Sequence, residues 1–237
     1  MNIEIFTTYK NRRSLFQRSF ESLLACTDRW DFRLTVVCDG GGIPDFILSH
    51  ADCIISTTQN LGLAPAMNSA LASIEMSNQF GEGSEFICYT QDDVLYSPGW
   101  LHTLRDRFAE LEAEHNLGFA SGVECIEHPI RADLGDGLLL KDHIRATQMF
   151  ARREYWMSMW PIPPFDPETG NVRAKPHGGM GSGCDWWFLR DHPNSVCLTG
   201  RTNLVIPGLC QHLGYDQSTW LGRHMPESDC DKEKMTR

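Results

Sequence analysis

Apolar and polar stretches alternate in a regular order over the first half of the chain. Apolar residues at helical spacing predict helices around residues 16–24, 63–74 and 101–111. Short apolar runs without that spacing predict strands at 3–8, 34–38, 53–56, 86–91 and 118–123. The order of strand, helix and strand predicts an α/β fold, with a mostly parallel sheet flanked by helices and joined by right-handed crossovers. Ser97 and Pro98 suit the start of the third helix, as its N-cap and first residue.

The pattern is less regular after residue 125. Residues 127–142 are rich in Asp and Gly and predict a loop, whereas 146–153 predict a return to the sheet followed by a helical turn. Prolines and glycines between 161 and 183 exclude a regular element and favour a functional lid. Residues 184–191 predict a helix and 204–206 a late strand.

We expect one domain over residues 1–225. The change in pattern after residue 125 divides this domain into two halves, 1–125 and 126–225. Residues 226–237 are charged and poor in apolar side chains, so they predict a solvated tail.

The fourth predicted strand ends abruptly in two adjacent carboxylates, Asp92 and Asp93. Ligands of open α/β sheets bind beyond the carboxyl ends of the strands. Two neighbouring carboxylates there repel each other unless a positive group lies between them, and a divalent metal that carries a phosphate is a common solution. A solvated turn that begins with the two acids explains these residues equally well.

Composition narrows the class of protein. A formal charge of −10 argues against a surface built mainly for phosphate backbones. Nine cysteines without a Cys-x-x-Cys spacing indicate reduced thiols rather than a disulfide framework or a zinc site. No apolar run approaches 18 residues, so we expect a soluble, cytoplasmic protein that does not span a membrane.

The polar residues at the predicted strand ends resemble those of the inverting family-2 glycosyltransferases, which have the GT-A fold. Four stretches over roughly residues 1–125 carry the resemblance, in order and spacing: Thr7-Thr8-Tyr9-Lys10-Asn11-Arg12, Val36-Val37-Cys38-Asp39-Gly40-Gly41, Asn60-x-Gly62-x-x-x-Ala66-x-Asn68, and Thr90-Gln91-Asp92-Asp93-Val94 with Ser97-Pro98-Gly99-Trp100-Leu101. The resemblance implies a transferase that uses a nucleoside-diphosphate sugar, with a UDP-sugar favoured, and Mn²⁺ or Mg²⁺. It also implies that residues 1–125 are the nucleotide-sugar-binding half and residues 126–225 the acceptor and catalytic half.

The resemblance also implies roles for individual residues. Asp39 would accept a hydrogen bond from the base, and Asn60 and Asn68 would hold the loop and helix start beside the diphosphate. Asp92 would be the main metal ligand, with Asp93 beside it. The residues expected to contact the donor are Thr7, Thr8, Arg12, Asp39, Asn60, Gly62, Asn68, Gln91 and Asp92.

Three further positions matter for the expected chemistry. Asp185 would be the catalytic base, because its segment looks like the place where the family opens a helix with its base. His212 looks like a third metal ligand, although a core or surface histidine is an equally good interpretation. The chain departs from the family at Thr90 and Cys184, where acids are usual, and this puts the strength of metal binding and catalysis in question.

Two alternatives come from other classes of protein. A sugar-phosphate nucleotidyltransferase would also use a nucleotide-binding sheet and a metal, but the first strand lacks a phosphate loop rich in Gly, Arg and Lys. A degenerate, non-catalytic nucleotide-sugar-binding protein would account for Thr90 and Cys184. The sequence leaves the acceptor open among polysaccharide, lipid-linked sugar, protein, small molecule and modified nucleobase. A nucleic-acid acceptor has weak support from the basic residues between 131 and 153.

Overall fold

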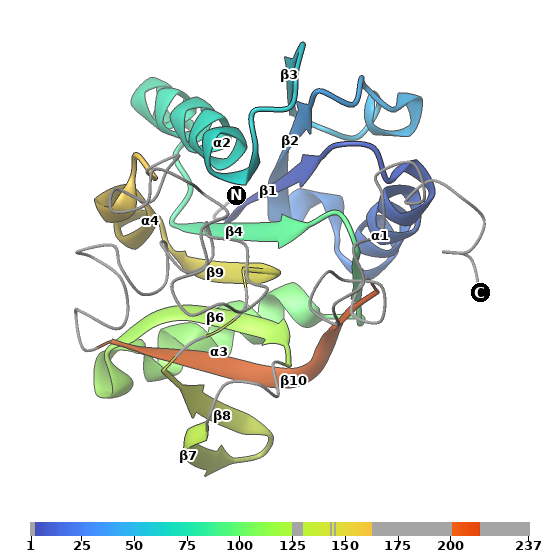
Figure 1. The fold of residues 1–237 in the computed structure, drawn as a ribbon. Helices are drawn as coiled ribbons and strands as arrows, with labels where there is room; N and C mark the ends of the chain where they lie inside the picture. Colours follow the sequence, from blue (N-terminus) through green and yellow to red (C-terminus); the bar gives the residue numbers. More distant parts are fainter. Residues whose placement is uncertain (1–2, 125–129, 143, 145, 163–200, 214–237) are drawn as a thin grey trace, which may run out of the picture.

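The computed structural model describes residues 3–124, 130–142, 144, 146–162 and 201–213. Within them, ten strands form one sheet in the order β3-β2-β1-β4-β9-β6-β10-β8-β7, and β5 pairs with β10 beside this path (Figure 1). The strands are β1 (Ile3–Tyr9), β2 (Phe32–Asp39), β3 (Cys53–Thr57), β4 (Phe86–Gln91), β5 (Val94–Tyr96), β6 (Leu117–Val123), β7 (Ile130–Gly135), β8 (Leu138–Lys141), β9 (Gln148–Arg152) and β10 (Thr202–His212).

The first four strands are parallel, as the sequence predicts. Ile3 of β1 lies between Phe32 of β2 and Phe86 of β4, and β3 continues the parallel pairing beyond β2. The segments that connect these strands include helices that bury their apolar faces on the sheet, an arrangement typical of parallel pairing. The carboxyl ends of β1 to β4 therefore lie at the same edge of the sheet.

The second half of the sheet is mixed. β9 runs antiparallel to β4 and β6, whereas β10 runs parallel to β6 and antiparallel to β5 and β8. The loop expected at 127–142 is wrong, because β7 and β8 form an antiparallel hairpin there. Asp136 and Gly137 make its turn with φ of 52° and 75°, and an Asp-Gly pair favours such a two-residue turn. The residues of β7 are mostly exposed, so no apolar run marked the strand.

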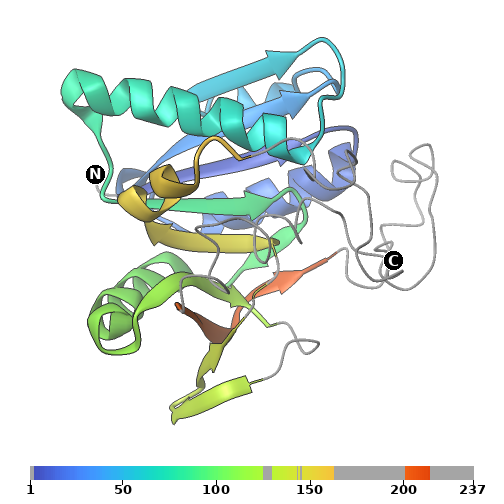
Figure 2. The same cartoon turned by 60° about the vertical axis from the view of Figure 1, so that its left-hand side comes forward.

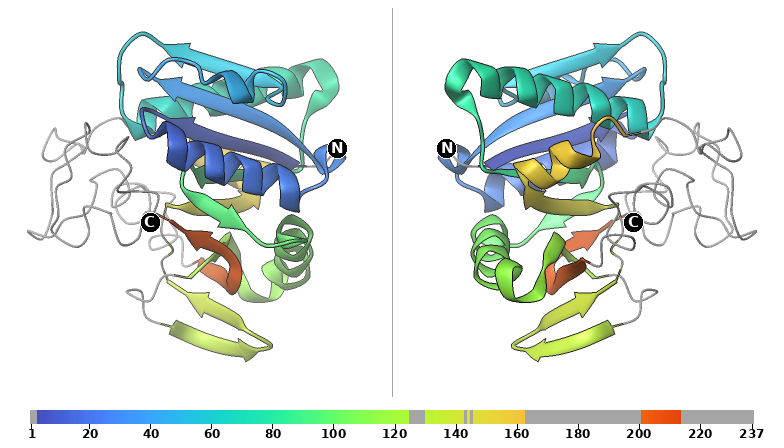
Figure 3. Two further views of the ribbon diagram at one scale, coloured as in Figure 1. Left: turned by 90° about the vertical axis from the view of Figure 1, so that its right-hand side faces the viewer. Right: turned by 90° about the vertical axis from the view of Figure 1, so that its left-hand side faces the viewer.

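Helices cover both faces of the sheet, as Figures 2 and 3 show. The apolar faces of α1 and α3 pack on one face, and those of α2 and α4 pack on the other. The helices predicted within the described residues are confirmed, with bounds α1 (Arg13–Cys26), α2 (Leu63–Ser77), α3 (Trp100–His115) and α4 (Arg153–Met159). Shorter helical turns lie at Arg29–Asp31, Asp45–Ile47 and Asn78–Glu82.

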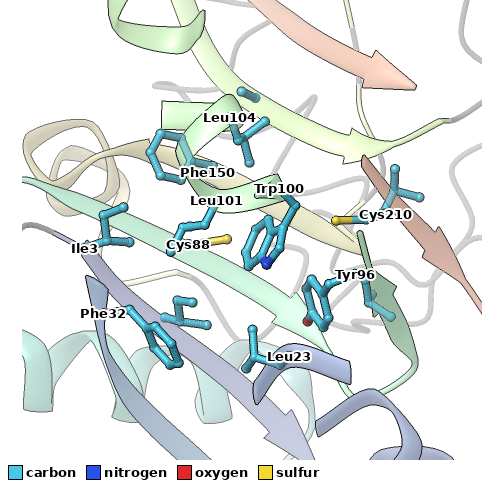
Figure 4. Close-up of a cluster of buried hydrophobic side chains, with 14 of the residues drawn as sticks. Ile3, Leu23, Phe32, Cys88, Tyr96, Trp100, Leu101, Leu104, Phe150 and Cys210 are labelled. Carbon is cyan, nitrogen blue, oxygen red and sulfur yellow. The ribbon is translucent and has the colours of Figure 1, made fainter. Parts of the chain in front are cut away.

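The start of α3 differs from the expectation. Gly99 is the N-cap, with a φ of 76°, and the hydroxyl of Ser97 instead donates to the carbonyl oxygen of Gly208 at 3.1 Å. Trp100 then begins the helix fully buried, and its indole Nε1 donates to the Thr27 hydroxyl at 2.7 Å. Figure 4 shows this indole between Cys88 of β4 and Cys210 of β10, in the core that α3 covers.

Several predictions fall outside the described residues. They are the catalytic base Asp185, the helix at 184–191, residues 163–183 of the proline- and glycine-rich stretch, and the charged tail at 226–237. In the part of the chain that is described, none of the helices has the length and apolarity that crossing a membrane requires.

Candidate functional site

Two buried carboxylates occupy the turn that follows β4. The side chains of Asp92 and Asp93 are 5% and 2% exposed. The chain turns here from β4 into β5, and β5 pairs with β10 so that Val94 lies opposite His212. The amide of Leu213 donates to the Asp93 carbonyl oxygen at 2.8 Å, which ties the end of β10 to the acid pair. Residues from the two ends of the described chain therefore meet at this turn.

Arg12 binds both carboxylates. It lies directly before α1, at the carboxyl end of β1, and its Nη1 donates to Asp93 Oδ2 at 2.7 Å while Nη2 donates to Asp92 Oδ1. Its side chain is 27% exposed. Because the partners lie on neighbouring strand ends, the parallel pairing of β1 with β4 is what brings them together.

The surroundings shift the pKa values of the two acids in opposite directions. Burial raises the pKa of Asp92 to about 6, and the Asp93 carboxylate adds to this effect while Arg12 opposes it. Burial also acts to raise the pKa of Asp93, but Arg12 and a hydrogen bond from His212 outweigh it and lower that pKa to about 2. The pKa of Arg12 is raised, because its two carboxylate partners outweigh its own loss of hydration.

His212 completes the cluster. Its Nε2 lies 3.2 Å from Asp93 Oδ2, and its side chain is 10% exposed. Among the described residues, His212 Nδ1 and Asp93 Oδ1 are both buried and have no hydrogen-bond partner. Unpaired buried polar atoms are rare and call for a missing ligand, ion or water.

The donor types at this turn suit a divalent metal ion. Two carboxylates and an imidazole are reasonable ligands for Mn²⁺, and the unpaired Asp93 Oδ1 has lone pairs that a cation could use. In the described part of the chain, however, no three His, Cys, Asp or Glu side chains are grouped so that they could hold an ion. Arg12 instead supplies the positive charge between the acids.

Asp39 organises the loop that follows β3. Its carboxylate is buried at the end of β2 and accepts hydrogen bonds from the amides of Leu61 and Gly62 at 2.8 and 2.9 Å and from the Thr57 hydroxyl at 3.1 Å. Gly62, with a φ of 92°, is the N-cap of α2. The carboxylate therefore shapes the path of the chain into that helix. A carboxylate has more lone pairs than these three donors use, so the expected contact with a base stays a prediction.

Glycines let the loops at this edge approach one another closely. A Cβ on Gly41 would lie 1.2 Å from the Lys10 carbonyl oxygen, and one on Gly40 would lie 2.5 Å from the Asn60 amide nitrogen. Any larger residue would force the backbone apart, so the Asp39-Gly40-Gly41 sequence is what allows the ends of β1, β2 and β3 to touch.

Asn60 and Asn68 hold backbone, but at different places. Asn60 Oδ1 accepts from the amide of Gly62 at 3.1 Å, within its own loop. Asn68, in the second turn of α2, donates to the Ile162 carbonyl oxygen at 2.6 Å and accepts from the Ile162 amide at 2.7 Å. Asn68 therefore joins α2 to the segment after α4, a contact that spacing along the sequence does not reveal.

The remaining predicted residues lie along β1 and β4. Thr7 and Thr90 are register partners on the two strands. The Thr7 hydroxyl is buried and has no hydrogen-bond partner among the described residues, while the Thr90 hydroxyl shares a 2.7 Å hydrogen bond with Tyr96. The hydroxyls of Thr8 and Tyr89 are 3.4 Å apart. Thr90 thus belongs to the core, and its position is not that of a metal ligand.

The sequence interpretation missed three of these partners. Thr57 and Ile162 contact the predicted site residues Asp39 and Asn68 from segments that are 18 and 94 residues away, whereas Tyr96 contacts Thr90 across the turn that follows β4. Of the three, only Thr57 carried a signal, as a polar residue directly after an apolar strand. Gln91 is half-buried, and its backbone N–H donates to the Thr147 carbonyl oxygen at 2.9 Å. This bond continues the pairing of β4 with the chain before β9.

The sheet order and the two helical layers are those of the GT-A fold, which this chain shares with solved glycosyltransferase structures. Three solved structures illustrate the likeness. Residues 1–349 of TarS from S. aureus share 13% sequence identity with this chain, at a TM-score of 0.51 over 97% of this chain and 68% of that one. The mannosyltransferase PcManGT from Pyrobaculum calidifontis, in complex with GDP-Man and Mn²⁺, has 13% sequence identity with this chain. Its TM-score is 0.57 over 89% of this chain and 56% of that one. GalNAc-T7 with UDP, GalNAc and Mn²⁺ has 9% sequence identity with this chain, at a TM-score of 0.53 over 89% of this chain and 43% of that one.

These likenesses show the fold. This chain spans only 42% of the longer TarS chain. No protein-family model matches the sequence, and no curated protein matches it.

Proposed function

We propose that this protein is an inverting family-2 glycosyltransferase, which moves a hexosyl or pentosyl group from a nucleoside-diphosphate donor to an acceptor hydroxyl. The observation that carries the proposal is the buried pair Asp92 and Asp93 at the carboxyl end of β4, joined there by Arg12 and His212. In a GT-A fold this edge is where a nucleotide would bind. The four strand-end motifs, which are in register with the family, support the assignment.

The donor would lie across the ends of β1, β2 and β4. Asp39 would accept a hydrogen bond from the base while it holds the loop at 57–62. The N-terminus of α2 follows Gly62 directly, and the amide groups at a helix N-terminus attract phosphate. Thr8 and Arg12 would face the diphosphate from the end of β1. We favour a UDP-sugar, on the family resemblance.

Asp92, Asp93 and His212 would hold Mn²⁺ or Mg²⁺. When bound, such an ion supplies positive charge to the oxygens of the departing nucleoside diphosphate, so that no proton donor is needed. PcManGT and GalNAc-T7 contain Mn²⁺ in their solved complexes, which supports the choice of metal.

The acceptor hydroxyl would lose its proton to Asp185, which lies outside the described residues. The hydroxyl oxygen would then attack the anomeric carbon in line with the leaving group, which inverts the configuration. Polysaccharide, small molecule and modified nucleobase all remain candidate acceptors. We place the enzyme in the cytoplasm, because the five described cysteines are free thiols.

A panel of UDP- and GDP-sugars, incubated with the protein and Mn²⁺, tests the proposal. A glycosyltransferase releases a nucleoside diphosphate, by slow hydrolysis even without an acceptor. Release of pyrophosphate from a nucleoside triphosphate and a sugar phosphate would identify a nucleotidyltransferase instead.

One observation favours a second candidate. Arg12 already neutralises the acid pair, and Thr90 is committed to the core, so a non-catalytic nucleotide-sugar-binding protein would have the same arrangement. Binding of a nucleotide sugar with neither hydrolysis nor transfer would support that candidate.

A further inference from the structure

The acid pair that would hold a metal ion already has a cation in contact with it. Arg12 donates a hydrogen bond from one guanidinium nitrogen to each carboxylate, and the three side chains are largely buried together. His212 shares Asp93 Oδ2 with Arg12, which leaves Asp93 Oδ1 and His212 Nδ1 buried without partners among the described residues.

This turn needs a positive charge whenever both acids are ionised. Two adjacent carboxylates at 5% and 2% exposure repel each other, and burial removes the water that would otherwise screen them. A guanidinium and a divalent ion at the same carboxylate oxygens would also repel each other strongly, because little solvent separates them. The guanidinium and the metal ion should therefore bind the acid pair in turn and not at the same time.

We propose that Arg12 and a divalent cation are alternative occupants of the Asp92–Asp93 pair, so that Arg12 holds the acids in the free protein and leaves them when the metal binds. This inference rests on the proposed function, since it concerns the same site. Arg12 acts here as a positioning residue that sets the affinity of the acids for metal.

The position of Arg12 in the fold would allow it to bind phosphate after it leaves the two carboxylates. Arg12 lies between β1 and α1, at the edge where the loops after β1 and β2 touch. Its side chain is 27% exposed, whereas the two acids are buried. A guanidinium that leaves the carboxylates there remains at the strand ends, and it binds phosphate oxygens as readily as carboxylate oxygens. Metal and diphosphate should therefore strengthen each other's binding through Arg12.

Titration of free Mn²⁺ by electron paramagnetic resonance, without nucleotide, tests the exchange. Arg12→Gln removes the competing cation, so we expect it to bind Mn²⁺ at least tenfold more tightly than the unmodified protein. Arg13→Gln is the matched control, because Arg13 is the next residue and pairs with Asp45 at the surface. We expect the control to bind Mn²⁺ like the unmodified protein. Equal or weaker Mn²⁺ binding by Arg12→Gln would overturn the inference.

Thermal unfolding gives a second readout that needs no activity. Without metal, Arg12→Gln leaves two buried acids without their guanidinium, and only Asp93 keeps a partner, in His212, so the midpoint of the variant should fall below that of the unmodified protein. Mn²⁺ should then raise the midpoint of Arg12→Gln by more than it raises the other. If Arg12→Gln fails to fold, Arg12→Lys keeps the charge but loses the two-pronged contact, and its Mn²⁺ affinity should rise by a smaller factor. An unchanged affinity in Arg12→Lys would overturn the inference.

Nucleotide in the same samples separates this inference from the proposed function. UDP should raise Mn²⁺ affinity by a larger factor in the unmodified protein than in Arg12→Gln, since only the former has a guanidinium to release. An equal factor in both proteins overturns the inference while the proposed function stands. If Mn²⁺ binds to none of the proteins, the inference fails. If UDP also fails to bind when Mn²⁺ is present, the proposed function fails with it.

Discussion

Replacing Asp39 with Asn tests whether one carboxylate builds the nucleotide edge of the sheet. Asp39 is 5% exposed and accepts three hydrogen bonds, two of them from the backbone amides of Leu61 and Gly62. Asparagine has nearly the same shape, but only one of its two terminal atoms can accept. Its amide nitrogen would face either the Gly62 amide or the donors from Leu61 and Thr57.

The expected loss of stability can be worked from these contacts. A hydrogen bond to a charged acceptor contributes about 1.5–3 kcal/mol, and a neutral one about 1 kcal/mol. Asn60 Oδ1 is a second acceptor for the Gly62 amide at 3.1 Å, which reduces the penalty at that donor. We therefore expect Asp39→Asn to lower the free energy of unfolding by about 2–3 kcal/mol.

Urea unfolding measures this change as a shift of the midpoint at a constant slope. Asp45→Asn is a suitable control, because that carboxylate is 78% exposed and solvent screens its ion pair with Arg13. A change below about 0.5 kcal/mol in Asp39→Asn would refute the claim that Asp39 organises this loop.

Three further outcomes follow from other parts of the site. Asn68→Ala should lower the free energy of unfolding by about 2–3 kcal/mol in urea, because it leaves both polar backbone groups of Ile162 unpaired; a change under about 1 kcal/mol would contradict this. Asp185→Asn should slow sugar transfer by about 10²- to 10⁴-fold while donor binding measured by calorimetry persists, and a fully active variant would remove Asp185 from the mechanism. The pKa of Asp92 in the folded protein, about 6, lies above its usual value near 3.9, so its contribution favours folding at low pH and is lost as the pH rises from about 4 to 6. In metal-free buffer, the stability of Asp92→Asn relative to the unmodified protein should therefore rise by about 2–3 kcal/mol as the pH increases from about 4 to 6, and stay constant at higher pH. A stability difference that does not change with pH would show that the Asp92 pKa is not raised.

Local pattern was sufficient to predict the first half of the fold. The strands β1, β2 and β4 are apolar runs buried on both faces, and β3 is a shorter, half-buried apolar run. The helices between these strands carry clear apolar stripes, so each element could be predicted from its own residues. β7 did not, because its exposed residues form an edge strand with no apolar run. The helix start at Ser97 was wrong for a related reason, since the Ser97 hydroxyl binds Gly208, a partner 111 residues away.

The candidate site was predictable as a set of positions but not as a set of contacts. Strand ends placed Arg12, Asp39 and Asp92 at one edge, because parallel strands end together. The pairing of Arg12 with the acids depends on which strands are neighbours in the sheet, and β1 is far from β4 in sequence. Thr90 illustrates the same limit: its contact with Tyr96 follows from the turn after β4, which no local pattern specified.

Calorimetric titration of UDP and GDP, with and without Mn²⁺, tests the central claim most directly. Our account predicts that a nucleoside diphosphate binds in the presence of Mn²⁺ and that Asp92→Ala abolishes the metal-dependent part of the affinity. If neither nucleotide binds, or if Asp92→Ala binds as the unmodified protein does, the acid pair after β4 is not the donor site.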